Sequence, residues 1–195
     1  LYMALRVPQG GLPDFLAAAR TLGLGGFNLT MPHKLDILPY LSDMTPEARR
    51  AGSVNSVRLG EKGLEGHSTD GIGFRRALQD LGYDFPGRTV TILGAGGAAR
   101  SIAMTAVDSG ARSVRIVNRT LAKAQALCAE APVLEAFSLD QAHQVLPDTD
   151  ILINTTPVGM EGTTGRSDFS FLSALKAGAP AMDCIYAPAV TPFLA

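Results

Sequence analysis

A glycine-rich turn between an apolar strand and a helix constrains this chain more than any other feature. The stretch 89–93 is apolar and β-branched, and glycines follow it at positions 94, 96 and 97. Glycine permits a tight turn and a close backbone approach to phosphate, and the free amides of a helix start attract negative charge. The turn could also be a purely structural loop. We predict a dinucleotide pyrophosphate site formed by Gly94, Ala95, Gly96, Gly97 and Ala98.

The residues after the next predicted strand indicate which dinucleotide binds. Strand 113–117 leads into Asn118, Arg119 and Thr120, where this type of fold contacts the adenosine ribose. Enzymes that use NAD usually place an acidic residue there, and this chain has none. Arg119 and Lys123 are cations that could pair with a 2′-phosphate, and Thr120 adds a hydroxyl. We therefore predict NADP as the cofactor, with ordinary solvated surface charges as the alternative interpretation of the two cations.

The order of predicted elements indicates an α/β protein with two domains. The first part contains a helix near 12–19, a short strand at 27–30, helices at 33–41 and from Pro46, a hairpin over 54–59 and 64–69, and a helix over 74–81. Strands near 89–93, 113–117, 151–155 and 181–185 then alternate with helices, which predicts a Rossmann-type, doubly wound parallel sheet. Residues 83–87 are the expected linker. We predict an α/β substrate-binding domain over 1–86 and an NADP-binding domain over 87–195.

Composition narrows the partners to small molecules. The net charge is −1 with no basic tract, and no apolar run of membrane-spanning length occurs, so neither nucleic acid nor a membrane is expected. Cys128 and Cys184 are too few for a disulfide framework, and the three histidines lack metal-ligand spacing. We expect buried, inert thiols, no metal and a cytoplasmic location. A monomer and a homodimer both remain open.

Several further motifs, in this order, closely resemble those of shikimate dehydrogenases. They are Asn28 to Lys34 (NLTMPHK), Gly52 to Ser56 (GSVNS), Ser68 to Phe74 (STDGIGF), the glycine turn, Asn118 to Thr120, Asn154 to Met160 (NTTPVGM) and Asp183 to Pro188 (DCIYAP). The resemblance covers essentially the whole chain. It implies reversible reduction of 3-dehydroshikimate to shikimate by NADPH, a step of chorismate and aromatic amino acid biosynthesis.

The same resemblance implies roles for individual residues. Lys34 and Asp70 match the family's catalytic pair, and the predicted substrate contacts are Thr30, Lys34, Asn55, Asp70 and Tyr186. A lysine ammonium can protonate the oxygen of a ketone that receives a hydride, and a nearby carboxylate can orient it. Without the family, Asp70 could be a simple helix cap and Lys34 a solvated lysine. Thr155, Thr156 and Cys184 follow predicted strands and complete the predicted NADP contacts.

The chain departs from the family pattern mainly at its ends. Ser56 and Ser68 replace a threonine and an asparagine, and both changes keep a small polar group. The family's N-terminal strand with its serine pair has no counterpart before Leu1, and its C-terminal segment with a glutamine has none after Ala195. We therefore expect an excised segment that is weak or inactive alone and active when extended. A quinate or aminoshikimate dehydrogenase and a noncatalytic metabolite or NADP sensor are the alternatives.

Overall fold

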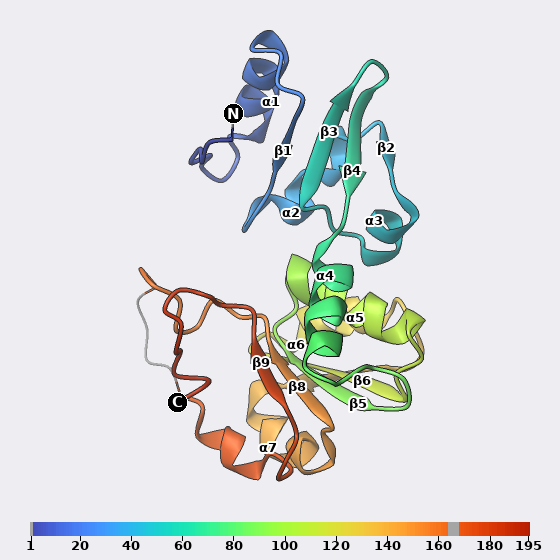
Figure 1. Ribbon diagram of the computed structural model, residues 1–195, viewed down its shortest axis with the longest axis vertical. Helices are drawn as coiled ribbons and strands as arrows, with labels where there is room; N and C mark the ends of the chain where they lie inside the picture. Colours follow the sequence, from blue (N-terminus) through green and yellow to red (C-terminus); the bar gives the residue numbers. More distant parts are fainter. Residues whose placement is uncertain (1, 164–167) are drawn as a thin grey trace. The chain divides into compact units, whose positions relative to one another are not determined.

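A computed structural model describes residues 2–163 and 168–195 (Figure 1). The chain forms two compact units, Leu1–Asp70 and Gly71–Ala195. The division falls at the start of helix α4 (Asp70–Asp80), whereas the sequence predicted a boundary after residue 86. The difference has a packing cause, because Leu78 and Phe74 of α4 contact the core of the second unit. The predicted linker at 83–87 therefore lies after α4, and α4 already belongs to the second unit.

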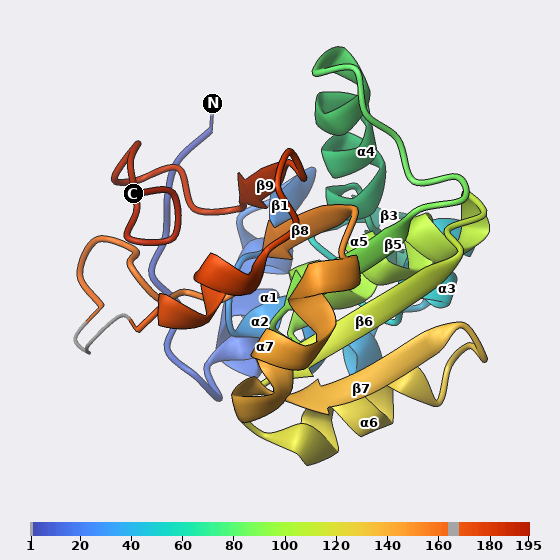
Figure 2. The same cartoon turned by 90° about the horizontal axis from the view of Figure 1, so that it is seen from below.

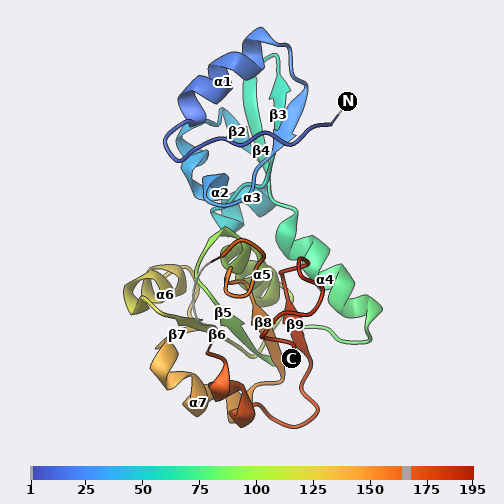
Figure 3. The ribbon, with the colours of Figure 1, turned by 90° about the vertical axis from the view of Figure 1, so that its left-hand side faces the viewer.

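The first unit is a four-stranded mixed sheet with helices. Its strands are ordered β1-β3-β4-β2, with β1–β3 and β3–β4 antiparallel and β2–β4 parallel. The strands are β1 (Gly26–Asn28), β2 (Asp43–Met44), β3 (Ser56–Gly60) and β4 (Gly63–His67), and the helices are α1 (Leu12–Thr21), α2 (His33–Asp36) and α3 (Pro46–Ala51). Figure 3 shows these elements from another side. Leu16 of α1, Ile37, and Val57 and Leu64 of the hairpin pack into one core.

Local sequence signals place most elements of this unit correctly. The hairpin forms, and Pro46 begins α3 as predicted, after an N-cap Thr45 whose hydroxyl accepts from the amide of Ala48 at 3.3 Å. The prediction of one helix over 33–41 is wrong in its second half. The helix α2 ends at Asp36, and a separate 3₁₀ turn covers Leu38–Tyr40. Pro39 has no amide hydrogen to continue the helix.

The second unit contains the predicted Rossmann-type parallel sheet. Five strands are ordered β7-β6-β5-β8-β9, and every neighbouring pair is parallel. The strands are β5 (Thr89–Leu93), β6 (Ser113–Asn118), β7 (Leu134–Ser138), β8 (Ile151–Asn154) and β9 (Ala181–Asp183). The helices are α5 (Gly97–Asp108), α6 (Leu121–Cys128) and α7 (Ala142–Val145), with 3₁₀ turns at Leu139–Gln141, Leu146–Asp148 and Ser170–Ala174. In Figure 2, β7 and β9 form the two edges of the sheet.

The two faces of this sheet carry separate cores because side chains alternate along each strand. Ile92 and Ile116 point to the face covered by α4, α5 and α6. Leu93, Val117 and Leu152 point to the opposite face, where α7 and Phe193 pack. Strand order reverses between β5 and β8, which is the topological switch point where ligands bind in such sheets. The glycine turn follows β5 directly and thus lies at this point.

Two glycines of α4 should respond oppositely to alanine. A Cβ at Gly71 would overlap the backbone carbonyl of Ser101 and the hydroxyl of Thr105 in α5, whereas a Cβ at Gly73 would meet open space. Gly71→Ala should lower the free energy of unfolding by about 1–3 kcal/mol through overpacking. Gly73→Ala is the matched control and should raise it by up to about 1 kcal/mol through helix propensity. Urea denaturation measures both, and equal effects would contradict the close packing of α4 on α5.

Asp150 should make stability depend on acid pH. Its hydrogen bond from Lys176 Nζ at 2.8 Å, and next its bond from the Thr89 amide at 3.0 Å, hold its pKa below the usual value. The unfolded chain then takes up the proton more readily, so this stabilisation is present above about pH 4 and is lost as pH falls through the folded pKa. Asp150→Asn should cost about 2 kcal/mol near neutral pH and much less in acid. Urea midpoints across this range test it, and a pH-independent difference would refute it.

Candidate active site

Lys34, Asp70 and Asn55 meet in the first unit. Lys34 Nζ donates to Asp70 Oδ2 at 2.5 Å, and Asn55 Nδ2 donates to Asp70 Oδ1 at 2.7 Å. The side chains of Lys34 and Asp70 are 18% and 22% exposed, so solvent reaches both without surrounding them. Both Asp70 oxygens accept from side chains and from no backbone amide that the structure describes. Asp70 is therefore more than the simple helix cap considered from the sequence.

Main-chain hydrogen bonds hold Lys34 and Asn55 in place. Val54 donates its amide to the carbonyl of Lys34 at 3.0 Å, and Asn55 donates its amide to the carbonyl of His67 at 3.1 Å. Thr69 orients the Asn55 side chain, because its amide donates to Asn55 Oδ1 at 3.1 Å and its hydroxyl accepts from Nδ2 at 2.9 Å. The sequence analysis did not single out Thr69 as a functional residue. The only signal was its place beside Asp70.

The other two predicted substrate contacts are more exposed. Thr30 ends the segment after β1, and its carbonyl accepts from the amide of His33 at 2.9 Å in the turn that begins α2. Its side chain is exposed. Tyr186 belongs to the second unit, after β9, and is 91% exposed. Both side chains are thus accessible to a ligand.

The glycine turn has the form that a dinucleotide site requires. Gly94 has φ +108°, and a Cβ there would lie 2.5 Å from Thr155 Oγ1. Gly96 faces open space and is the N-cap of α5, with no side-chain cap hydrogen bond. Glycine has no side chain that could accept a hydrogen bond from the first amides of this twelve-residue helix, so the N-cap residue leaves these amides uncapped. A phosphate would satisfy these amides and meet the positive end of the helix.

Two cations follow β6 in the predicted positions. Arg119 and Lys123 are exposed, and neither has an ion-pair partner among the residues that the structure describes. Asn118 Nδ2 donates to the carbonyl of Thr120 at 2.9 Å, which shapes the turn between β6 and α6. The turn thus presents two unpaired positive charges beside an exposed threonine hydroxyl. This donor set fits a phosphate on the adenosine ribose.

The loops after β8 and β9 hold the remaining predicted cofactor residues. Thr155 donates its hydroxyl to the carbonyl of Leu93 at 2.7 Å, so it also ties β8 to β5. Thr156 is partly buried, and Cys184 is exposed. Both cysteines were expected to be buried. This is wrong for Cys184, which follows the edge strand β9, and Cys128 is only partly buried. Burial, together with the nearby Glu135, raises the pKa of the Cys128 thiol to about 11, in line with an unreactive group.

Neither a metal centre nor a membrane helix emerges from the described ranges. No group of three or more His, Cys, Asp or Glu side chains there could hold a metal ion. The helices within 2–163 and 168–195 are too short or too polar to cross a bilayer.

Comparison with known proteins assigns the family. The chain matches the model of the shikimate dehydrogenase substrate binding domain over residues 1–57 and that of shikimate / quinate 5-dehydrogenase over residues 75–160. It is 39% identical to shikimate dehydrogenase (NADP(+)) of Lysinibacillus sphaericus over 196 aligned residues, which cover 99% of this chain and 70% of that protein.

Solved structures agree in fold. Shikimate 5-dehydrogenase of Thermus thermophilus, in complex with NADP(H) and shikimate, is 33% identical with a TM-score of 0.80, covering 96% of this chain and 68% of that one. Quinate dehydrogenase of Corynebacterium glutamicum, in complex with NAD, is 29% identical with a TM-score of 0.79, covering 94% and 67%. Both the sequence match and the fold lead to one assignment: this chain belongs to the shikimate dehydrogenase family.

Proposed function

We propose that this protein reduces the ring ketone of 3-dehydroshikimate to shikimate with NADPH. The observation that carries the proposal is the Lys34 ammonium held at 2.5 Å by the Asp70 carboxylate, which Asn55 fixes from its other side. An enzyme that reduces a ketone needs a proton donor next to the oxygen that becomes negative. Such a donor is most effective when it is oriented before the substrate arrives.

Residues of the second unit fit the cofactor. The amides at the start of α5 would hold the pyrophosphate, and Arg119, Lys123 and Thr120 would hold the 2′-phosphate of the ribose. Gly94, Ala95, Gly96, Gly97 and Ala98 form the turn, and Asn118, Thr155, Thr156 and Cys184 are the other proposed contacts. When bound, NADPH supplies the hydride that reduces the carbonyl carbon. The match to relatives named as NADP(+) enzymes supports this choice over NAD.

Lys34 and Asp70 then perform the proton chemistry. As the carbonyl carbon is reduced, the oxygen gains negative charge, and Lys34 stabilises this charge and donates a proton to it. Asp70 orients the ammonium, and it can also accept a hydrogen bond from a ring hydroxyl. Asn55, Thr30 and Tyr186 are proposed to bind the remaining substrate hydroxyls or carboxylate. In the reverse direction Lys34 takes the proton from the hydroxyl of shikimate.

Quinate oxidation is the second candidate function. A quinate dehydrogenase in complex with NAD is among the structural neighbours, and the second family model includes quinate enzymes. The exposed and unpaired Arg119 favours NADP, however, because the adenosine ribose of NAD carries no 2′-phosphate for it to bind. We infer a cytoplasmic enzyme acting on small molecules, consistent with its two cysteines and the absence of a disulfide framework from the sequence.

The decisive experiment follows the loss of NADPH absorbance with 3-dehydroshikimate. It is run on this chain and on the chain extended to its natural ends. NADH replaces NADPH in a parallel assay. Quinate and aminoshikimate are alcohols, so they are tested in the oxidative direction with NADP+ and with NAD+, by the gain of absorbance of the reduced cofactor. We expect turnover of 3-dehydroshikimate with NADPH, and much weaker turnover with NADH. Oxidation of quinate with NAD that is faster than reduction of 3-dehydroshikimate with NADPH would favour the second candidate. NADPH binding without turnover of any of these substrates would favour a sensor instead.

A further inference from the structure

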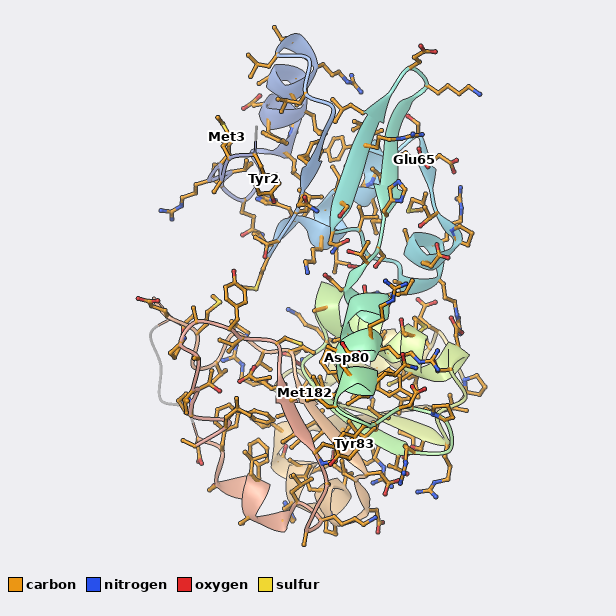
Figure 4. All side chains as sticks on the ribbon, in the orientation of Figure 1. Tyr2, Met3, Glu65, Asp80, Tyr83 and Met182 are labelled. Atoms are coloured by element: carbon orange, nitrogen blue, oxygen red, sulfur yellow. The ribbon has the colours of Figure 1, made fainter. Side chains whose placement is uncertain are left out.

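Two loops of the second unit are joined by a polar network that the sequence analysis did not identify. The loops follow β8 and β9, which run side by side in the sheet (Figures 1 and 3). Asn154 and Asp183 are the last residues of these strands and are direct cross-strand partners. Figure 4 labels Met182, the residue before Asp183, on β9.

Asp183 is the centre of the network. Its Oδ1 accepts from Asn154 Nδ2 and from the amide of Ile185, both at 3.0 Å, and its Oδ2 accepts from the hydroxyl of Thr191 at 2.6 Å. Asn154 and Thr191 are 0% and 1% exposed, and Asp183 is partly buried, so these bonds are only partly accessible to water. One carboxylate thus holds the beginning and the end of the loop 184–191.

Asn154 extends the network into the other loop. Its Oδ1 accepts from the amide of Thr156 at 3.0 Å and from the Thr156 hydroxyl at 2.7 Å. Further along, the amide of Glu161 donates to the carbonyl of Ala187 at 3.0 Å, so the two loops are also bonded directly. The amide side chain of Asn154 therefore connects Asp183 on one strand with Thr156 on the other loop.

We propose that Asn154 and Asp183 are positioning residues that hold Thr156 and the segment 184–186 in a fixed register for NADPH. The inference rests on the proposed function, in which Thr156 and Cys184 contact the cofactor and Tyr186 the substrate. The network lies at the carboxyl ends of β8 and β9, on the half of the sheet that binds the second nucleotide in doubly wound folds. Neither Asn154 nor Asp183 needs to touch the ligand, because each acts through the loop it anchors.

The test compares two buried threonines that share the same substitution. Thr191→Val removes only the hydroxyl that bonds Asp183. Thr149→Val is the control, because Thr149 is also fully buried but bonds Thr91 and the carbonyl of Val145 before β8 begins. Both variants should lose stability. Only Thr191→Val should raise the Kd for NADPH, by about three- to tenfold, as expected for a weakened polar network.

The addition of a negative charge tests the pairing itself. Asn154→Asp places a second carboxylate against Asp183, and we expect the Kd for NADPH to rise on the order of tenfold or more and kcat to fall. Adding Asp183→Asn removes the repulsion and restores one hydrogen bond between the pair, so the double variant should bind NADPH more tightly than Asn154→Asp alone. Calorimetry gives the Kd, and amide exchange at Thr156 and Ile185 reports whether the loops are held.

These measurements separate positioning from simple destabilisation. A variant that is only partly folded has fewer active molecules but an unchanged Kd and KM in those that remain. An unchanged Kd in Thr191→Val and Asn154→Asp, or equal shifts in Thr191→Val and Thr149→Val, would overturn the proposal. The natural protein is assayed first: failure to reduce 3-dehydroshikimate would count against the proposed function alone, because Kd and amide exchange still report on the loops.

Discussion

Lys34→Ala should lower kcat for 3-dehydroshikimate by about 10²–10⁴-fold, the usual contribution of a general acid. The variant keeps the fold of the first unit but removes the only ammonium that Asp70 contacts in the described structure. Because the predicted cofactor residues belong to the second unit, the Kd for NADPH should not change. Steady-state kinetics with the substrate and calorimetric titration with NADPH measure the two quantities separately.

Lys62→Ala is the matched control for this prediction. Lys62 belongs to the same unit and lies exposed in the turn between β3 and β4, with no ion-pair partner among the residues described. Lys62→Ala makes the same change of charge and size as Lys34→Ala but away from the proposed site, so its kcat should equal that of the natural protein. Turnover by Lys34→Ala at the natural rate would remove Lys34 from the chemistry and with it the main support for the proposed function.

Arg119→Ala should weaken the binding of NADPH about 10- to 100-fold and leave the binding and turnover of NADH unchanged. A hydrogen-bonded pair between arginine and phosphate contributes about 1.5–3 kcal/mol, and each 1.4 kcal/mol is about tenfold in affinity. NADH lacks the 2′-phosphate and therefore loses nothing when the guanidinium is removed. The ratio of kcat/KM for NADPH to that for NADH should fall by the same factor.

Arg76→Ala controls for the loss of a positive charge from the same unit. Arg76 is exposed on α4 and has no ion-pair partner within the described ranges. Its removal should not alter the preference between the two cofactors. An equal loss of NADPH and NADH binding in Arg119→Ala would show that Arg119 supports the turn after β6 and does not recognise the 2′-phosphate.

The fold was predicted best where the hydrophobic pattern agrees with the residues that typically begin and end a strand. Strands 89–93 and 113–117 are rich in β-branched residues and each follows an arginine. The first ends at the glycine turn and the second at a polar turn, and the structure confirms both strands. β7 was not predicted, because Leu134–Ser138 contains a glutamate and alternates only weakly. Its place beside β6 comes from parallel pairing over five residues, which a single sequence does not reveal.

The candidate site was predictable residue by residue but not as a network. Lys34, Asn55 and Asp70 stood out through a family resemblance, and the structure brings them within hydrogen-bond distance. Thr69 and Asp183 were assigned no role, and Asn154 was considered only as part of a motif expected to contact NADP. Their roles in the network depend on partners that are 14 to 29 residues away in sequence. Spacing along a chain cannot show such contacts, because they arise only when strand ends meet at one edge of a sheet.

The proposed proton donor, its carboxylate and the amide that holds them all come from one contiguous stretch, residues 34 to 70. The cations proposed for the ribose phosphate come from a separate stretch, after β6. A gene therefore encodes these two functions in segments that recombination can exchange independently. Chimaeras that take residues 1–70 from another family member should inherit much of its substrate choice while retaining the cofactor preference of this chain. New pairings of substrate and cofactor could thus arise in evolution by exchange of a single gene fragment.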